Sequence, residues 1–198
     1  WMAACVPHCQ EVAQKHYGAD GWVMHHLSDP FACATPMDGV HGVWPMGAAW
    51  LVQHVWEHFA FTNDLEFLRT QGWPLMKGAA RFMLDFLVEA PSGVPGAGWL
   101  VTCPSHSPEN RFRKADGSVS MFTYAATMDL EICHNLFTNC LRAMTALGDA
   151  TQAPFRAELE EALERLAPLQ ISPRTGRLQE WIEDYEEPEP GHRHISHL

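Results

Sequence analysis

The chain has 198 residues, of which 46% are hydrophobic and 19% charged, a composition typical of a packed globular protein. Its formal charge of −11 argues against a nucleic-acid partner, because such proteins bind phosphates through clustered Lys and Arg. No run of about 18 apolar residues is present that could span a bilayer. Because the chain begins at Trp1-Met2 and stops directly after a dense His and Arg cluster, we expect it to be an internal fragment of a longer protein.

Hydrophobic periodicity predicts an all-α protein of paired helices, with almost no alternating strand pattern. The helix expected at 45–61 is apolar nearly all round, which predicts burial on most of its sides. Gly18 is suited to end the first helix, Asp64 to begin the third, and Pro74 to kink or restart it. Helices are expected at residues 2–17, 45–61, 65–87, 130–147 and 155–166, a short extended run at 99–103, and a polar, exposed loop at 111–120.

The first long loops carry His, Asp and Trp side chains. Residues 21–30 have no helical period and contain His25, His26 and Asp29. These side chains could bind a metal or a sugar, or they could simply be polar loop residues that bond to the backbone. Trp44 directly precedes the second expected helix, at 45–61. Long loops in a compact domain are usually functional, because ordering their backbone costs entropy.

The most informative loop is Pro104-Ser105-His106-Ser107-Pro108-Glu109-Asn110. Its two prolines restrict the backbone and disfavour helix in the residues that precede them, so the loop can hold a side chain in one direction. Such a rigid mount suits a general acid, which would be Glu109. The alternative interpretation is a helix start, with Ser107 as N-cap, Pro108 in the first turn and Glu109 near the positive helix end.

The chain ends in an acidic run at 183–189 followed by His192-Arg193-His194-Ile195-Ser196-His197. A run of charged residues is usually a solvated loop. Here three histidines flank an arginine, a denser cluster of polar side chains than packing alone requires. Together with the earlier loops, these indole, imidazole, guanidinium and carboxylate groups suit a neutral polyhydroxylated ligand: sugar ring faces stack on indole, and hydroxyls bond to charged groups. A glycosidase needs an acid and a base, about 6.5 to 9.5 Å apart if it inverts.

A competing motif is His54-Val55-Trp56-Glu57-His58, which matches the H-x-x-E-H pattern of zinc metalloproteases. Its context is weak, because the helix is so apolar that His54, Glu57 and His58 are expected to be buried and hydrogen-bonded to one another. No persuasive third ligand follows, and the six cysteines show none of the zinc spacings. We therefore expect no metal, and keep a zinc metalloprotease as the alternative.

Five motifs follow one another along the chain. They are Gly21-Trp22…His25-His26…Asp29, Val43-Trp44-Pro45-Met46-Gly47…Ala49-Trp50-Leu51…His54…Trp56-Glu57-His58, Pro104-Ser105…Ser107-Pro108-Glu109-Asn110, Leu178-Gln179-Glu180-Trp181 and His192-Arg193-His194…Ser196-His197-Leu198. This ordered series resembles the catalytic domain of glycoside hydrolase family 95, mostly 1,2-α-L-fucosidases with some α-L-galactosidases. The resemblance covers essentially all 198 residues.

The resemblance implies an (α/α)6 barrel, of which residues 1–198 would be an incomplete, internal part, and hydrolysis with inversion without metal or cofactor. It implies a fucosylated oligosaccharide or glycan as the ligand, and it favours an extracellular or periplasmic location. Glu109 would be the general acid. The side chains implied to contact the sugar are Trp44, Arg193, His194, His25, His26 and Asp29.

The chain also departs from the family pattern. In the family an upstream asparagine pair and a downstream aspartate activate the attacking water, and no Asn-x-Asn occurs in this chain. Leu27, Ser28 and His106 are smaller departures, which leave the preference between fucose and galactose open. A barrel that binds glycans without cleaving them is therefore a further alternative, and residues 1–198 alone are expected to be inactive.

Overall fold

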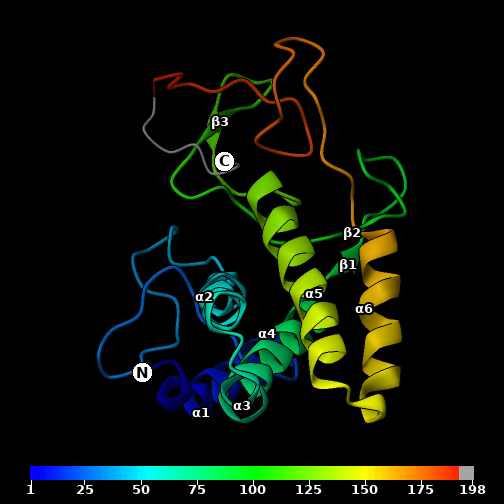
Figure 1. Ribbon diagram of the computed structural model, residues 1–198. Coiled ribbons are helices and arrows are strands. Elements are labelled where there is room, and N and C mark those ends of the chain that lie inside the picture. Colours follow the sequence, from blue (N-terminus) through cyan, green and yellow to red (C-terminus); the bar gives the residue numbers. More distant parts are fainter. Residues whose placement is uncertain (192–198) are drawn as a thin grey trace. The chain divides into compact units, whose positions relative to one another are not determined.

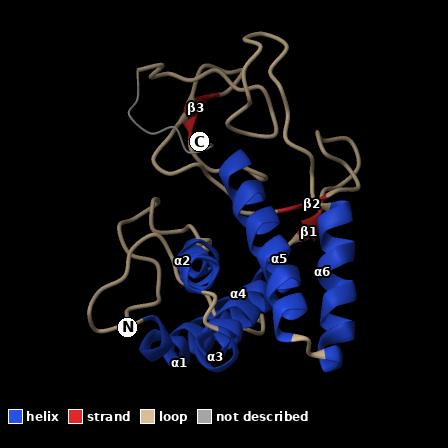
Figure 2. Ribbon diagram, viewed as in Figure 1, coloured by secondary structure: helices blue, strands red, loops and turns tan. Residues whose placement is uncertain are grey.

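The computed structural model describes residues 1–191, and most of its regular structure is helical (Figures 1 and 2). The chain divides into two compact units. The first comprises Trp1–Phe86 and Ile132–Glu164, and the second comprises Leu87–Glu131 and Arg165–Leu198. No helix within residues 1–191 is both long enough and apolar enough to cross a membrane.

The first unit consists of helices, most of which begin and end where their sequence predicts. Gly18 adopts a left-handed conformation (φ 64°) and ends the first helical segment. Asp64 accepts a hydrogen bond from Phe67 N (2.9 Å) and so caps the third. Pro74 is the second residue of a new helix, so the helix restarts there as predicted. The elements are α1 (Met2–Val12), a π-helical turn (Ala13–Tyr17), α2 (Gly47–Thr62), α3 (Leu65–Phe67), a second π-helical turn (Leu68–Gly72), α4 (Trp73–Phe86), α5 (Thr127–Leu147), a 3-10 turn (Ala150–Gln152) and α6 (Ala153–Arg165). The start of α5, up to Glu131, and the last residue of α6 belong to the second unit.

The expectation that α2 is buried on most sides was wrong. Its covered face is one stripe that includes Val52, Val55 and Phe59, while Trp50 and Phe61 are 41% and 91% exposed. The helix packs against α4 and the second π-helical turn. Apolar composition therefore overestimated the burial of this helix within the described residues.

The second unit carries two small antiparallel sheets. Strand β1 (Val88–Glu89) pairs with β2 (Leu100–Val101). Strand β2 lies inside the run at 99–103 that was predicted to be extended. Strand β3 (Phe112–Arg113) pairs with β4 (Val119–Ser120). The prediction of an exposed loop at 111–120 was wrong for Phe112, which is 2% exposed.

Contacts far along the chain explain the burial of Phe112. Its ring stacks on Tyr185, with centroids 4.0 Å apart, and meets Trp181 edge-on at 5.3 Å. These rings, together with Ala126, form an apolar cluster in the second unit. The cluster joins the β3–β4 hairpin to the C-terminal segment of the same unit.

Candidate functional site

The loop that carries Glu109 is a tethered turn, not the start of a helix. Ser105 and Thr123 exchange backbone hydrogen bonds of 2.9 and 2.8 Å, and Asn110 N donates to Ser107 O at 2.6 Å. Glu109 itself is half-buried, like Pro108, whereas Ser107 and Asn110 on either side of this pair are buried. The structure therefore contradicts the helix-start interpretation and agrees with a fixed loop that keeps Glu109 partly accessible.

A buried carboxylate, Asp129, holds the first part of this loop. Asp129 lies in the first turn of α5 and is 1% exposed. Its Oδ2 accepts hydrogen bonds from Ser105 Oγ (2.6 Å) and Thr102 Oγ1 (3.1 Å). Ser105 Oγ also accepts a hydrogen bond from Ala126 N at 2.8 Å. The positive end of a helix favours a carboxylate at this position, so α5 provides a stable anchor for the loop.

A second buried carboxylate, Glu180, holds the part that carries Glu109. Glu180 is 8% exposed, and its Oε1 accepts hydrogen bonds from Ser107 Oγ and from Asn110 Nδ2, the latter at 3.1 Å. Asn110 Nδ2 also donates to Ser107 Oγ at 3.1 Å. Glu109 is thus bracketed by two residues that share one acceptor oxygen. Glu180 lies in one of the five motifs, but its sequence context alone predicted no role for it.

The backbone around Glu180 is held in turn by buried polar groups. Thr127 N donates to Glu180 O (3.0 Å), and Thr127 Oγ1 donates to Gln179 O (2.5 Å). The amide of Gln179 donates to Trp181 O (3.0 Å) and Ile182 O (3.2 Å), so it closes the turn that follows. Glu180 therefore projects from a backbone that is fixed on both sides.

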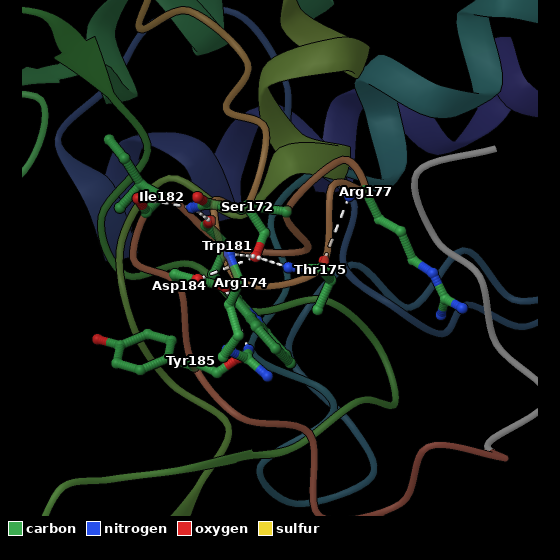
Figure 3. Close-up of polar contacts among 9 residues, drawn as sticks. Ser172, Arg174, Thr175, Arg177, Trp181, Ile182, Asp184 and Tyr185 are labelled. Carbon is green, nitrogen blue, oxygen red and sulfur yellow. Dashed lines mark hydrogen bonds and ion pairs between the residues drawn. The ribbon is translucent and has the colours of Figure 1, made fainter.

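A further polar cluster supports the same segment, as Figure 3 shows. Ser172 Oγ donates to Asp184 Oδ2 (2.9 Å) and accepts from the backbone N–H groups of Arg174 and Thr175 (3.2 and 3.1 Å). The guanidinium of Arg174 reaches Asp184 Oδ1 (3.2 Å) and Tyr185 O (2.9 Å). These contacts tie the turn before Glu180 to the segment after it.

In the first unit, His25 is a buried, neutral histidine. A carbonyl can only accept, so the 2.7 Å contact between His25 Nδ1 and Ala34 O places the proton on Nδ1. His25 Nε2 then accepts from Tyr17 O–H at 2.5 Å. Burial lowers the pKa of His25, and its hydrogen bond to Ala34 opposes that shift. Both ring nitrogens are engaged within the protein.

The neighbouring His26 and Asp29 are both partly buried, and they differ in their contacts. His26 Nε2 lies 3.9 Å from Asp38 Oδ2, and its side chain keeps 20% of its surface exposed. Asp29 Oδ1 accepts from the backbone N–H groups of Phe31 (2.9 Å) and Cys33 (3.1 Å). Asp29 thus shapes its own loop, as in the alternative in which these residues bond to the backbone.

The remaining residues predicted to contact a sugar are Trp44, Arg193 and His194. Trp44 is 5% exposed and packs edge-on against Trp50, with centroids 5.7 Å apart. Arg193 and His194 lie outside the described residues. Trp44 belongs to the first unit with the 21–30 loop, whereas Glu109 belongs to the second.

The H-x-x-E-H residues lie on the exposed side of α2, so the expectation that they form a buried network was wrong. His54 Nδ1 is 3.5 Å from Glu57 Oε2, with both side chains about two-thirds exposed (66% and 64%). The ring of His58 packs against Phe67 at 4.2 Å. Among residues 1–191 no three His, Cys, Asp or Glu side chains come together as a metal-binding group.

Comparison with known proteins agrees with the resemblance found in the motifs. Residues 1–198 match the family model of the glycosyl hydrolase family 95 catalytic domain. The chain is 40% identical over 200 residues to "Alpha-L-fucosidase 2" of Arabidopsis thaliana and 31% identical over 200 residues to "Probable alpha-fucosidase A" of Aspergillus niger. Both alignments cover the whole chain but only 23% and 24% of the relatives, so the chain spans about a quarter of their length. The chain belongs to the catalytic domain of glycosyl hydrolase family 95.

Proposed function

We propose that the protein is a glycoside hydrolase that removes terminal α-1,2-linked L-fucose, or L-galactose, from glycans with inversion. Membership of the family and the fucosidase names of both relatives support this activity. Residues 1–198 would be an internal part of one (α/α)6-barrel catalytic domain. The observation that carries the proposal is the tethered Glu109 loop, which two buried carboxylates hold.

Glu109 is the proposed general acid. It would donate its proton to the glycosidic oxygen as the bond between that oxygen and the sugar carbon breaks. Water would attack the same carbon from the opposite face, activated by groups that the family resemblance places outside this chain. General acid catalysis needs a donor held within hydrogen-bond reach of the leaving oxygen. The fixed, half-buried turn around Glu109 supports that role.

The sugar-binding residues are proposals of the same kind. Arg193 and His194 would bond to the sugar hydroxyls, and Trp44 would contribute an apolar wall. His26 keeps 20% of its side-chain surface exposed, which supports a direct contact with the sugar. The internal hydrogen bonds of His25 and Asp29 support a role in shaping their own loop rather than in contacting the sugar.

The test is Glu109→Gln in the full-length protein, with fucose release from a 2′-fucosylated oligosaccharide as the measurement. Gln keeps the shape of the side chain but has no acidic proton, so we expect kcat to fall about 10²- to 10⁴-fold. An aryl α-L-fucoside with a good leaving group needs less protonation and should lose less. The matched control is Glu186→Gln, at an exposed glutamate that pairs with Arg113 (3.8 Å). This variant should leave kcat unchanged.

Two outcomes would count against the proposal. Wild-type turnover of the natural substrate by Glu109→Gln would remove Glu109 from the mechanism. Glycan binding without any hydrolysis by the unmodified protein would instead favour the non-catalytic glycan-binding alternative.

A further inference from the structure

We propose that Glu180 is the positioning residue of the general acid: it fixes the turn that carries Glu109 by accepting hydrogen bonds from Ser107 and Asn110. The inference rests on the proposed function, because it assigns Glu180 a task only if Glu109 donates the proton. Glu180 would act through the loop, without contacting the substrate itself.

The geometry is a closed triangle of buried polar atoms formed by Glu180 and the two residues on either side of the Pro108-Glu109 pair. Ser107 Oγ, Asn110 Nδ2 and Glu180 Oε1 are mutually hydrogen-bonded, with Asn110 Nδ2 3.1 Å from each of the other two atoms. Ser107 is fully buried, and Asn110 and Glu180 are each 8% exposed. A backbone hydrogen bond from Asn110 N to Ser107 O (2.6 Å) closes the turn between them. The two residues that bracket Glu109 are therefore fixed relative to one oxygen atom.

A carboxylate is well suited to this position. The Ser107 hydroxyl and the Asn110 amide converge on one oxygen, which must accept from both. A carboxylate accepts several hydrogen bonds at once, and bonds to an ionised acceptor are stronger than neutral ones. Burial strengthens them further, because little water competes for the donors. Without an acceptor at position 180, both donors would be left to find new partners, and the turn would lose its orientation.

Glu180 can transmit rigidity because its own backbone is fixed. Thr127 N, at the start of α5, donates to Glu180 O at 3.0 Å, and Gln179 braces the following turn through Trp181 and Ile182. Hydrogen bonds therefore hold the loop that carries Glu109 to the start of α5 by two routes, one through Asp129 and one through Glu180. Misplacement of a catalytic group by about 1 Å can cost about 100-fold in rate, so such fixing affects turnover directly.

The experiment uses the full-length protein with Glu180→Ala, Glu180→Gln and Ser107→Ala, assayed on a 2′-fucosylated oligosaccharide and on 4-nitrophenyl α-L-fucoside. We expect Glu180→Ala to lower kcat on the oligosaccharide about 10- to 100-fold with little change in KM, and to affect the aryl fucoside much less. Glu180→Gln keeps an acceptor oxygen, so it should retain most of the kcat that Glu180→Ala loses. Glu183→Gln is the matched control: Glu183 Oε1 accepts from Tyr124 O–H (3.4 Å), and no hydrogen bond described for it reaches the Glu109 loop.

The decisive measurement is the double variant Glu109→Gln/Glu180→Ala. If Glu180 acts through Glu109, the double variant turns over the oligosaccharide no more slowly than Glu109→Gln alone, because the acid that needed positioning is already gone. If Glu180 merely stabilises the fold, its effect multiplies with that of Glu109→Gln and is equal on both substrates, and the inference is overturned. Thermal melting of each variant confirms that it is folded; should Glu180→Ala not fold, Ser107→Ala gives the same comparison with a smaller change.

Failure of the inference and failure of the proposed function look different. If Glu109→Gln abolishes oligosaccharide hydrolysis but Glu180→Ala and Ser107→Ala behave as wild type, the inference is wrong and the proposed function stands. If Glu109→Gln remains fully active, the proposed function fails, and the inference fails with it.

Discussion

His25 illustrates how two local contacts decide the chemistry of a single residue. Its Nδ1–H is committed to Ala34 O, so the ring can stay neutral only with Nε2 as an acceptor, which Tyr17 O–H satisfies. Protonation of Nε2 would turn that acceptor into a donor and place a charge in a buried site. The pKa of His25 is lowered for the same reason, chiefly by burial.

This arrangement predicts a pH dependence of stability. A histidine with a lowered pKa binds fewer protons when folded than when unfolded, so the folded state is progressively destabilised as the pH falls from the unfolded value of 6.5 through the lowered folded pKa. We expect the melting temperature to drop on going from about pH 7.5 to about pH 5.5, and to drop less in His25→Gln, which cannot titrate. Differential scanning calorimetry at both pH values measures this. His54→Gln, at an exposed histidine, is the control, and equal drops in wild type and His25→Gln would contradict the prediction.

How far single residues could be predicted depended on where their partners lie in the sequence. Glu109 could be singled out because its neighbouring prolines restrict the loop locally. Glu180 could not, because its partner Ser107 is 73 positions away and a glutamate near an acidic run is indistinguishable from solvated surface. The H-x-x-E-H match misled for a related reason: spacings of three and four place side chains on one helix face but do not say which face is buried.

Elements with strong local signals were predicted well, and those that depend on distant contacts were not. The helix boundaries at Gly18 and Asp64 follow from their own backbone and side-chain chemistry. The β3–β4 pair has two-residue strands, too short to show alternation, and Phe112 is buried by Trp181 and Tyr185 from far along the chain. Periodicity therefore predicted a mostly helical chain but not its small sheets.

At the level of elements, the Gly21-Trp22 motif reflects the packing of a loop onto α4. Trp22 is 1% exposed; its Nε1–H donates to Leu75 O (2.9 Å) and its backbone N–H to Gly78 O (3.3 Å). A Cβ on Gly78 would lie 2.6 Å from Trp22 Cδ1, closer than side chains tolerate. The indole and the glycine of α4 therefore form one close-packed contact.

Gly78→Ala tests this contact against helix propensity. Alanine favours a helix by about 1 kcal/mol over glycine, so an open site would be stabilised. Here we expect the clash with Trp22 to dominate and the protein to lose about 1 to 3 kcal/mol of stability, measured by chemical denaturation. Gly191→Ala is the control, since its Cβ would meet nothing within 4 Å. An unchanged or increased stability in Gly78→Ala would contradict the prediction, because it would show that Trp22 can shift to accommodate the added methyl group at little cost.

At the scale of the whole molecule, the chain accounts for about a quarter of the relatives it matches. Within residues 1–191, several large apolar side chains are highly exposed, among them Phe31 (87%), Phe61 (91%) and Ile171 (63%). Exposed apolar surface promotes association between molecules when nothing covers it. Under the proposed function the site would also be divided, with the acid in this chain and the water-activating groups, as the family resemblance implies, elsewhere in the protein.

We therefore expect residues 1–198 expressed alone to release fucose from a 2′-fucosylated oligosaccharide at less than about a tenth of the full-length rate, because loss of one acid–base partner typically costs at least that much. Glu109 could still protonate a leaving oxygen, but water on the opposite face would lack a base. The assay compares the 198-residue chain, its Glu109→Gln variant and the full-length protein at equal molar concentration, after size-exclusion chromatography has isolated monomer and circular dichroism has confirmed helix. Monomer that turns over within tenfold of the full-length protein, and loses that activity in Glu109→Gln, would show that these residues contain their own base, and the division of the site between this chain and the rest of the protein would be wrong.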